Sequence, residues 1–304
     1  MKKPLKLSII IIALTGLLIS DVFAQSDDAK DMLERAENLI NKAEYESAIE
    51  LCNQAIEIMP QYAMAYFIRG NAKQFLKEYY SAITDYNRAI KIDSNYAEVY
   101  LKRGDAKMAL GDYPAAGVDY HSARNLTPDS VEPYIKLGDV EYYLENYDKA
   151  IEYYSSAIGI DAKCIDAYVR RGVAKAAKGE TGKALRDYKE AIKLDPNDAN
   201  AYKNLGDLYL DLDDYHYAIE SYTEAIKIDP TYTDAYFNRG LAYSLRAEYL
   251  NSNDLPRAIM DFSKVIEIEP QNAAGYEKRG LAYEALGDTA KAKADREKAK
   301  ELGL

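Results

Sequence analysis

Residues 199–232 read ANAYKNLGDLYLDLDDYHYAIESYTEAIKIDPTY, and this stretch carries the pattern that decides the fold. In its first half Tyr202 stands four residues before Gly206, and in its second half Ala218 stands four residues before Tyr222. Apolar residues recur at spacings of three and four in both halves, which is typical of amphipathic helices. An acidic residue before the second half and a proline near the end suit a helix start and a helix stop. The stretch therefore predicts a hairpin of two helices.

The same pattern recurs along the chain with a period of 34 residues. Glycines equivalent to Gly206 occur at every step from Gly70 to Gly240, and Gly280 follows after 40 residues because six residues are inserted around 251–254. We expect this insertion to lengthen the first helix of its unit and the loop that follows. Self-similarity of this period is the signature of a solenoid of stacked units. Eight units are predicted, with the boundaries 29–62, 63–96, 97–130, 131–164, 165–198, 199–232, 233–272 and 273–304.

The recurring aromatic, glycine, alanine, second aromatic and late proline resemble the tetratricopeptide repeat, and the resemblance covers residues 29–304. Tyrosine replaces the family's usual tryptophan, and Ser94 and Ala162 stand where proline is usual. The resemblance implies an all-α fold, a right-handed α-solenoid of antiparallel helix pairs. Glycine and alanine at the helix crossings would let two backbones approach each other, and an aromatic ring from the facing helix would fill the remaining space.

A charge pattern changes between the units in a coordinated way. Five units carry arginine directly before the glycine and aspartate in the second helix, namely Arg69 with Asp85, Arg103 with Asp119, Arg171 with Asp187, Arg239 with Asp261 and Arg279 with Asp295. Two other units carry Leu137 and Leu205 instead, and Tyr153 and Ser221 stand at their aspartate positions. Because the charge and its partner change together, we predict Arg–Asp ion pairs that bridge helices within a unit or between neighbouring units. The first unit is an exception.

The first 24 residues, MKKPLKLSIIIIALTGLLISDVFA, predict a secretory signal peptide. Lysines precede an apolar core from Leu7 to Ser20, and the small-x-small ending places the cleavage between Ala24 and Gln25. An uncleaved membrane anchor is the alternative, but a spanning helix needs about 20 apolar residues. Residues 25–28 would form a short linker. We therefore expect an exported protein, periplasmic or secreted, with no membrane span in the mature chain.

The composition argues against several classes of function. The net charge is −11, whereas a nucleic-acid binder is expected to carry a basic surface. Two cysteines and two histidines offer no spaced set of metal ligands. The stretch 179–183, GETGK, lacks the first glycine and the final Ser or Thr of a phosphate-binding loop. Since the sequence also shows no arrangement of nucleophile, base and acid, we predict no enzymatic activity, no metal and no cofactor.

The resemblance also implies where a partner would bind. In the family the first helices line a concave surface, and its partner-facing positions correspond here to Met64, Phe67, Asn71, Phe75, Leu101, Asp105, Ile135, Asp139, Tyr142, Tyr143, Val169, Lys203, Asp207, Phe237 and Asn238. These residues mix apolar groups with carboxylates, and four aromatic rings among them are expected to be exposed: Phe67, Phe75, Tyr143 and Phe237. An acidic, aromatic-lined groove suits a protein or peptide partner with basic and apolar residues.

The family's carboxylate clamp, which captures the C-terminal carboxylate of a chaperone, is only half present. Its positions correspond to Lys203, Asp207 and Asn238, followed by Ala274 and Lys278. Asp207 would repel a ligand carboxylate, and Ala274 offers no side-chain donor. The sequence therefore argues against chaperone binding of that kind.

These features together predict a non-enzymatic protein–protein interaction scaffold of the bacterial cell envelope, with its partner held in the concave groove. The alternative is a structural subunit of an envelope secretion or polymer-export assembly that uses its convex face or its ends. An enzyme or a carbohydrate-binding protein is a third alternative. The polar last helix, over 288–303, is expected to close the solenoid.

Overall fold

The computed structural model describes residues 27–250 and 253–304, and every regular element in these residues is an α-helix. The predicted signal peptide lies outside the described residues. Within them, no helix combines the length and the apolar character that crossing a membrane would require. The chain divides into two compact units between Asn146 and Tyr147, and each unit is described by itself.

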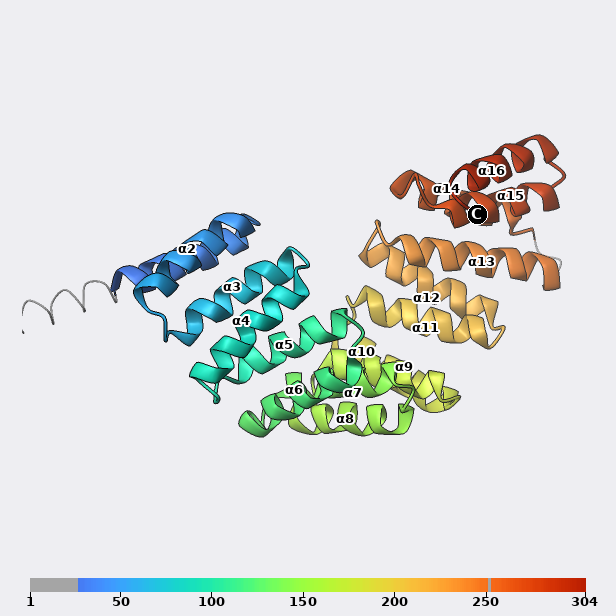
Figure 1. The fold of residues 1–304 in the computed structure, drawn as a ribbon. Helices are drawn as coiled ribbons and strands as arrows, with labels where there is room; N and C mark the ends of the chain where they lie inside the picture. The colour runs from blue at the N-terminus through green and yellow to red at the C-terminus, as the bar shows by residue number, and fades with distance from the viewer. Residues whose placement is uncertain (1–26, 251–252) are drawn as a thin grey trace, which may run out of the picture. The chain divides into compact units, whose positions relative to one another are not determined.

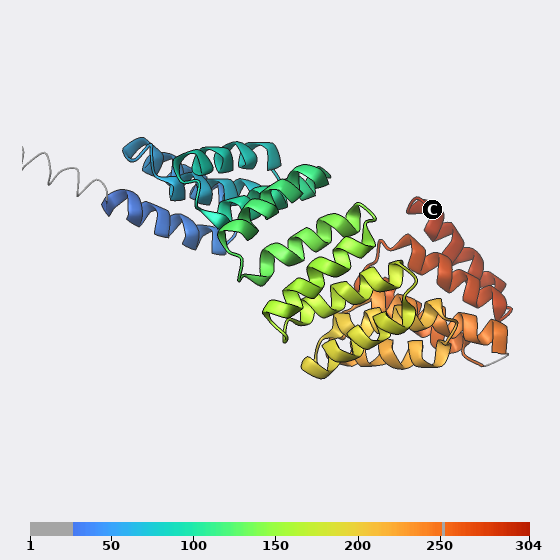
Figure 2. The ribbon, with the colours of Figure 1, turned by 90° about the horizontal axis from the view of Figure 1, so that it is seen from below.

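The first unit contains a helix over residues 27–41 and six further helices (Figure 1). These are α2 (Tyr45–Ile58), α3 (Ala63–Phe75), α4 (Tyr79–Ile92), α5 (Ala97–Ala109), α6 (Tyr113–Leu126) and α7 (Val131–Tyr143). Residues 27–28, which we expected in a linker, already belong to the first helix. Helices that follow each other in the chain pack antiparallel, α3 with α4 and α5 with α6 (Figures 1 and 2).

The second unit continues the same alternation. Its helices are α8 (Tyr147–Ile160), α9 (Ile165–Ala177), α10 (Thr181–Leu194), α11 (Ala199–Asp211), α12 (Tyr215–Ile228), α13 (Thr233–Leu250), α14 (Leu255–Ile268), α15 (Ala273–Ala285) and α16 (Thr289–Glu301). Helix α13 has 18 residues where α11 and α15 have 13, which confirms that the insertion lengthens the first helix of its repeat. The prediction of an all-α solenoid of antiparallel helix pairs is confirmed.

Tight turns join the two helices of a pair. Gly111, Gly179 and Gly287 occupy the left-handed region in three of these turns, with φ between 77° and 83°. Glycine suits such a position because it has no Cβ to clash with the backbone. The GETGK stretch that begins at Gly179 is therefore an interhelical turn and the start of α10.

Close helix crossings explain the recurring glycines. A Cβ placed on Gly206 of α11 would lie 2.6 Å from a ring carbon of Tyr222 in α12. The same crossing, with an added Cβ at 2.5–2.8 Å from the facing ring, pairs Gly70 with Tyr86, Gly104 with Tyr120, Gly172 with Tyr188 and Gly240 with Phe262. Because these rings are almost fully buried, they fill the space that glycine leaves, as the sequence predicts.

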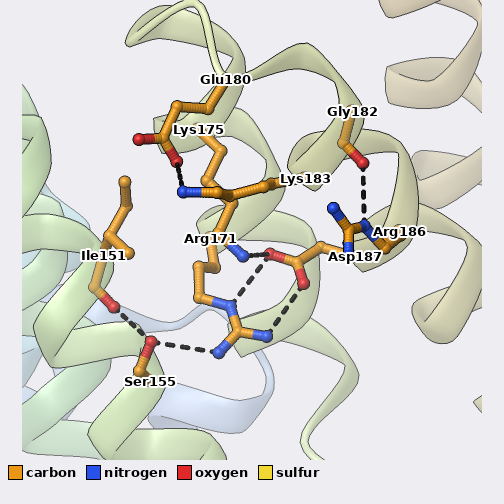
Figure 3. Close-up of polar contacts among 9 residues, drawn as sticks. All are labelled: Ile151, Ser155, Arg171, Lys175, Glu180, Gly182, Lys183, Arg186 and Asp187. Atoms are coloured by element: carbon orange, nitrogen blue, oxygen red, sulfur yellow. Dashed lines mark hydrogen bonds and ion pairs between the residues drawn. The ribbon is translucent and has the colours of Figure 1, made fainter.

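An arginine-centred cluster links the helices, and Figure 3 shows it in the fifth repeat. Arg171 of α9 donates from Nε and Nη2 to the two carboxylate oxygens of Asp187 in α10, at 2.9 Å each. Its third nitrogen, Nη1, donates to Ser155 Oγ of α8 at 3.0 Å, in the preceding repeat (Figure 3). Lys175 Nζ lies 2.7 Å from Asp187 as well. The cluster thus joins two helices of one repeat to the repeat before it.

The other four predicted ion pairs are present with the same geometry. Their Nη2–Oδ1 distances are 2.6 Å for Arg69–Asp85, 2.5 Å for Arg103–Asp119, and 2.8 Å for both Arg239–Asp261 and Arg279–Asp295. In each case Nη1 donates to the second helix of the preceding repeat, where the acceptors are Asn53, Asn87, Thr223 and Ser263. The sequence left open whether the arginine bridges helices within a repeat or between repeats, and both occur. The arginine pairs with the aspartate of its own repeat, and its Nη1 donates a hydrogen bond to the preceding repeat.

Candidate functional site

The first helices of successive repeats form a shared layer within each unit. In the first unit α3 contacts α5, and in the second unit α9 contacts α11, α11 contacts α13, and α13 contacts α15. This is the layer on which the resemblance places a partner.

A hollow of about 670 Å³ lies in this layer near the start of the first unit. We call it the N-terminal hollow, and its lining consists of Glu37, Ile40, Asn41, Ile68, Asn71, Gln74, Phe75, Lys77, Tyr79, Glu98, Lys102 and Ala109. Two of the predicted groove residues, Asn71 and Phe75, therefore lie together in one concave site.

The N-terminal hollow combines an apolar floor with side-chain amides. The Phe75 ring is 59% exposed and stacks on Tyr45 with 5.1 Å between ring centroids. The buried Tyr86 hydroxyl lies 2.9 Å from Asn71 Oδ1 and 2.8 Å from Gln74 Oε1. Because each amide has both a carbonyl oxygen and an NH₂ group, each keeps a second polar group for a ligand.

The charge of this hollow differs from our expectation. Glu37 and Glu98 line it together with Lys77 and Lys102, so two carboxylates are balanced by two ammonium groups. The groove that we expected to be acidic is therefore of mixed charge here. Lys102 and Lys77 were missed because only the positions carried over from the family were considered.

Two carboxylates of the predicted groove are already bound within the protein. Asp105 Oδ1 accepts a hydrogen bond from the Tyr120 hydroxyl at 2.8 Å and lies 2.9 Å from Lys136 Nζ. Burial and the neighbouring Asp105 carboxylate raise the pKa of Tyr120, so this phenol stays a hydrogen-bond donor. These contacts offset part of the negative charge that Asp105 would otherwise present to a partner.

Asp207 is bound in the same way in the second unit. It accepts from the Tyr222 hydroxyl at 2.8 Å and from Asn238 Nδ2 at 2.9 Å, and Lys203 Nζ lies 2.7 Å from its other oxygen. The predicted residues Lys203, Asp207 and Asn238 are thus brought together, but they bind one another. Asp207 takes up the donors that a chaperone carboxylate would need, in line with the argument against that ligand.

The other predicted groove residues differ in their exposure. Phe67, Leu101 and Val169 are buried, and Phe67, which we expected to be exposed, is only 4% accessible because it packs against Tyr86 and Tyr96. That expectation was wrong. Tyr143 is exposed as predicted, whereas Phe237 is only partly exposed and packs edge-on against Phe262. The remaining residues are partly exposed, namely Met64, Ile135, Asp139 and Tyr142.

Three lining residues come from the first helix, which we did not consider as part of the site. Glu37, Ile40 and Asn41 stand 34 residues before Asn71, Gln74 and Phe75. The repeat register therefore contained the signal. It was missed because the family positions were applied only from the second repeat onward.

The described residues offer no group of three or more His, Cys, Asp or Glu side chains that could hold a metal ion. Cys52 is fully buried, and burial raises its pKa to about 12, which keeps the thiol protonated at neutral pH. Cys52 therefore packs as a small apolar residue of the core.

Comparisons with known proteins identify the repeat. A family model for the TPR repeat matches residues 76–111, 174–213 and 206–245, and a second model for the tetratricopeptide repeat matches 131–164 and 273–302. Together the two models cover more than half of the chain. No curated protein matches the sequence.

Two solved structures of repeat proteins show the same fold. A tetratricopeptide repeat protein from Parabacteroides merdae ATCC 43184 is 18% identical with a TM-score of 0.66, covering 84% of this chain and 99% of that chain. The C-terminal part of a TPR repeat-containing protein from Cytophaga hutchinsonii is 19% identical with a TM-score of 0.60, covering 81% and 98%. The MamA crystal structure is 29% identical with a TM-score of 0.49, covering 55% and 94%. The chain belongs to the tetratricopeptide repeat family.

Proposed function

We propose that this chain is an exported, non-enzymatic scaffold that binds an extended segment of a partner protein in the N-terminal hollow. Tetratricopeptide repeats form scaffolds for protein–protein interaction, and the hollow is where this chain is best suited to that role. The observation that carries the proposal is a concave site of about 670 Å³ whose lining contains an exposed aromatic ring and three side-chain amides.

The chemistry of the hollow favours a peptide over other ligands. An extended segment presents N–H and C=O groups along its length, and the amides of Asn71 and Gln74 can donate to and accept from such groups. Ile40 and Phe75 offer apolar surface for one side chain of the segment. Burial of that side chain would supply most of the binding free energy.

Charged groups would then set the orientation of the segment. A basic residue would face Glu37 or Glu98, and the rest of the segment would avoid the ammonium groups of Lys77 and Lys102. Complementary charges add more to specificity and association rate than to affinity. We therefore expect the association rate to fall as salt is added, because exposed charges are screened over about 10 Å at 0.1 M.

Two matched variants test the proposal. Phe75→Ala removes the exposed ring from the hollow. Tyr249→Ala removes a similarly exposed ring, 65% accessible, that stacks on Tyr215, does not line the hollow and is not among the predicted groove residues. Peptides selected from a random library on residues 25–304 should bind Phe75→Ala at least about tenfold more weakly, since one anchoring contact is worth more than about 1.4 kcal/mol. Tyr249→Ala should bind them with unchanged Kd.

Equal affinities for the two variants would overturn the hollow as the binding site. A native partner that is captured equally well by wild type and Phe75→Ala would favour the alternative, a subunit of an envelope assembly that uses another surface. Export is tested separately. The amino-terminal peptide of the protein from the extracytoplasmic fraction should begin at Gln25, and a chain that keeps Met1 in the cytoplasm would contradict it.

A further inference from the structure

In the arginine clusters, the guanidinium group also contacts a tyrosine ring of the first helix. In five repeats the arginine that directly precedes the glycine makes two contacts. Its guanidinium is paired with the aspartate of the second helix and also lies over the ring of the tyrosine three residues earlier. The guanidinium carbon is 5.4–5.6 Å from the ring centroid in Arg69–Tyr66, Arg103–Tyr100, Arg171–Tyr168, Arg239–Tyr236 and Arg279–Tyr276. A cation at this distance from an aromatic face is attracted by the ring quadrupole.

The sixth repeat keeps the tyrosine but lacks the cluster. Tyr202 is present, whereas Leu205 stands at the arginine position and Ser221 at the aspartate position. Tyr209 stands where the lysine of the fifth-repeat cluster, Lys175, is found. All three charged members are therefore replaced, and Leu205 and Ser221 are buried.

A pocket of about 400 Å³ lies at these substituted positions. Its lining consists of Tyr202, Leu205, Tyr209, Tyr217, Ile219, Glu220, Ser221, Thr223 and Glu224. The Ser221 hydroxyl donates to the Tyr217 carbonyl at 2.8 Å, so it is already engaged within α12. The walls therefore offer three aromatic rings and two carboxylates, and this combination favours a cation.

In the next two repeats, a basic residue of the second helix also lies near a tyrosine ring. The sixth repeat has no basic residue at this position. Arg257 lies 5.8 Å from the Tyr243 ring and Lys291 lies 5.1 Å from the Tyr283 ring. The residue equivalent to these two cations is Tyr217, which is half exposed and lies 5.3 Å from Tyr209. Among the described residues, no arginine or lysine lies over the rings of Tyr202 and Tyr209.

We propose that this pocket, which we call the sixth-repeat pocket, binds an arginine side chain of a partner protein. The guanidinium would lie against the Tyr202 and Tyr209 rings, beside the positions where other repeats carry their own arginine and lysine. A planar guanidinium stacks on aromatic faces and is more weakly hydrated than an ammonium group, which favours arginine over lysine. The site is independent of the N-terminal hollow and would give the scaffold a second contact.

Some charged groups around the pocket attract a cation and others repel it. Glu220 and Glu224 attract a cation, although His216 Nε2 lies 3.4 Å from Glu220 and Lys227 Nζ lies 2.6 Å from Glu224. Lys189 of α10 is exposed and stands at the position where Ser155 accepts from Arg171. Its ammonium group would oppose a bound guanidinium, so its removal should strengthen binding.

Methyl NMR spectroscopy tests the proposal because Leu205 and Ile219 carry methyl groups in the pocket lining. The probe is a capped pentapeptide with one arginine between glycine and serine residues, and the matched control carries the neutral isostere citrulline. We expect saturable shifts of the Leu205 and Ile219 methyl signals with the arginine peptide. The citrulline peptide should bind at least tenfold more weakly. Equal responses to both peptides would overturn the proposal.

Variants that supply an internal cation provide the second arm. The double variant Leu205→Arg/Ser221→Asp restores the cluster of the other repeats and should abolish the shift of Ile219 while the fold is kept. Tyr217→Lys mimics Lys291 and blocks the pocket by a different route, so it decides the question if the double variant fails to fold. Lys189→Ser should tighten binding severalfold. Arginine-dependent shifts of Ile219 that persist in both blocking variants would refute the site.

Discussion

At the scale of single residues, the contact between Gly206 and the Tyr222 ring is one of five close crossings that place a strict demand on the sequence. An alanine methyl group at Gly206 would lie 2.6 Å from a ring that is fully buried, so the ring or the helix must move. We expect Gly206→Ala to lower the free energy of unfolding by about 1–3 kcal/mol, as overpacking does in other cores. Urea unfolding followed by circular dichroism measures this.

Gly159→Ala is the matched control, because among the described residues nothing lies within 4 Å of the added methyl group. Gly159 lies near the end of α8, where alanine is the better helix former by up to about 1 kcal/mol. The control should therefore be neutral or slightly stabilising. If both variants were destabilised equally, the close contact would not be the cause.

The burial of the Cys52 thiol predicts that it reacts slowly with thiol reagents in the folded protein. Because burial raises its pKa to about 12, hardly any thiolate forms at pH 8. In a Cys164→Ser variant, the remaining thiol should react with a disulfide reagent only at the rate of unfolding, with a gain of several orders of magnitude in denaturant. A fast reaction under native conditions would show that Cys52 is accessible.

Contacts between residues could be predicted from the sequence where two positions recur or change together. Glycine and its facing aromatic residue, and arginine and its aspartate, recur in register, so their contacts followed from comparison of the repeats. The burial of Phe67 could not be predicted in that way. It depends on how Tyr96, at the end of the second repeat, closes over the ring at 5.1 Å.

At the scale of helices, the arginine clusters act as connectors between neighbouring repeats. Asp261 is buried, and Arg239 donates to both its oxygens and to Thr223 of α12. We expect Arg239→Leu to destabilise the protein by about 3–5 kcal/mol, since it leaves a buried carboxylate without its counter-charge. Thermal and urea unfolding at pH 7 measure the loss.

The double variant Arg239→Leu/Asp261→Ser copies the pair that the sixth repeat carries and should recover a large part of this loss. Burial raises the pKa of Asp261, and loss of the guanidinium would raise it further. A raised carboxyl pKa costs stability above the ordinary pKa of about 4, so Arg239→Leu should come closer to wild type as the pH falls. A loss independent of pH, with no recovery in the double variant, would point to packing as the cause.

Some contacts between helices that the sequence did not predict occur only once. Lys136 reaches Asp105 from the following repeat, and Asn238 reaches Asp207 across α11 and α13. Such contacts depend on how successive helices are rotated relative to each other. Comparison of the repeats gives no information on this rotation. The sixth-repeat pocket had a sequence signal, the joint loss of arginine and aspartate, but its size depends on how Tyr217 is placed.

At the scale of the whole molecule, buried tyrosines tie stability to alkaline pH. Burial raises the pKa of Tyr86, Tyr120 and Tyr222 well above 10, and the carboxylates of Asp105 and Asp207 add to it. A phenol is neutral when protonated, so the folded state holds these protons more tightly than the unfolded state. Their contribution to stability is therefore complete below about pH 10 and falls above it, by up to about 1.4 kcal/mol per pH unit for each group.

We expect tyrosine absorbance at 295 nm to rise in two phases during alkaline titration. Phenols that are exposed to solvent should ionise first, near the ordinary tyrosine pKa of about 10, with the helices intact. The buried rings should ionise only together with loss of circular dichroism at 222 nm. Tyr120→Phe removes one linked proton and should make the loss of stability above pH 10 less steep. A single ionisation phase near pH 10, with no loss of helix, would contradict the burial of these tyrosines in the core.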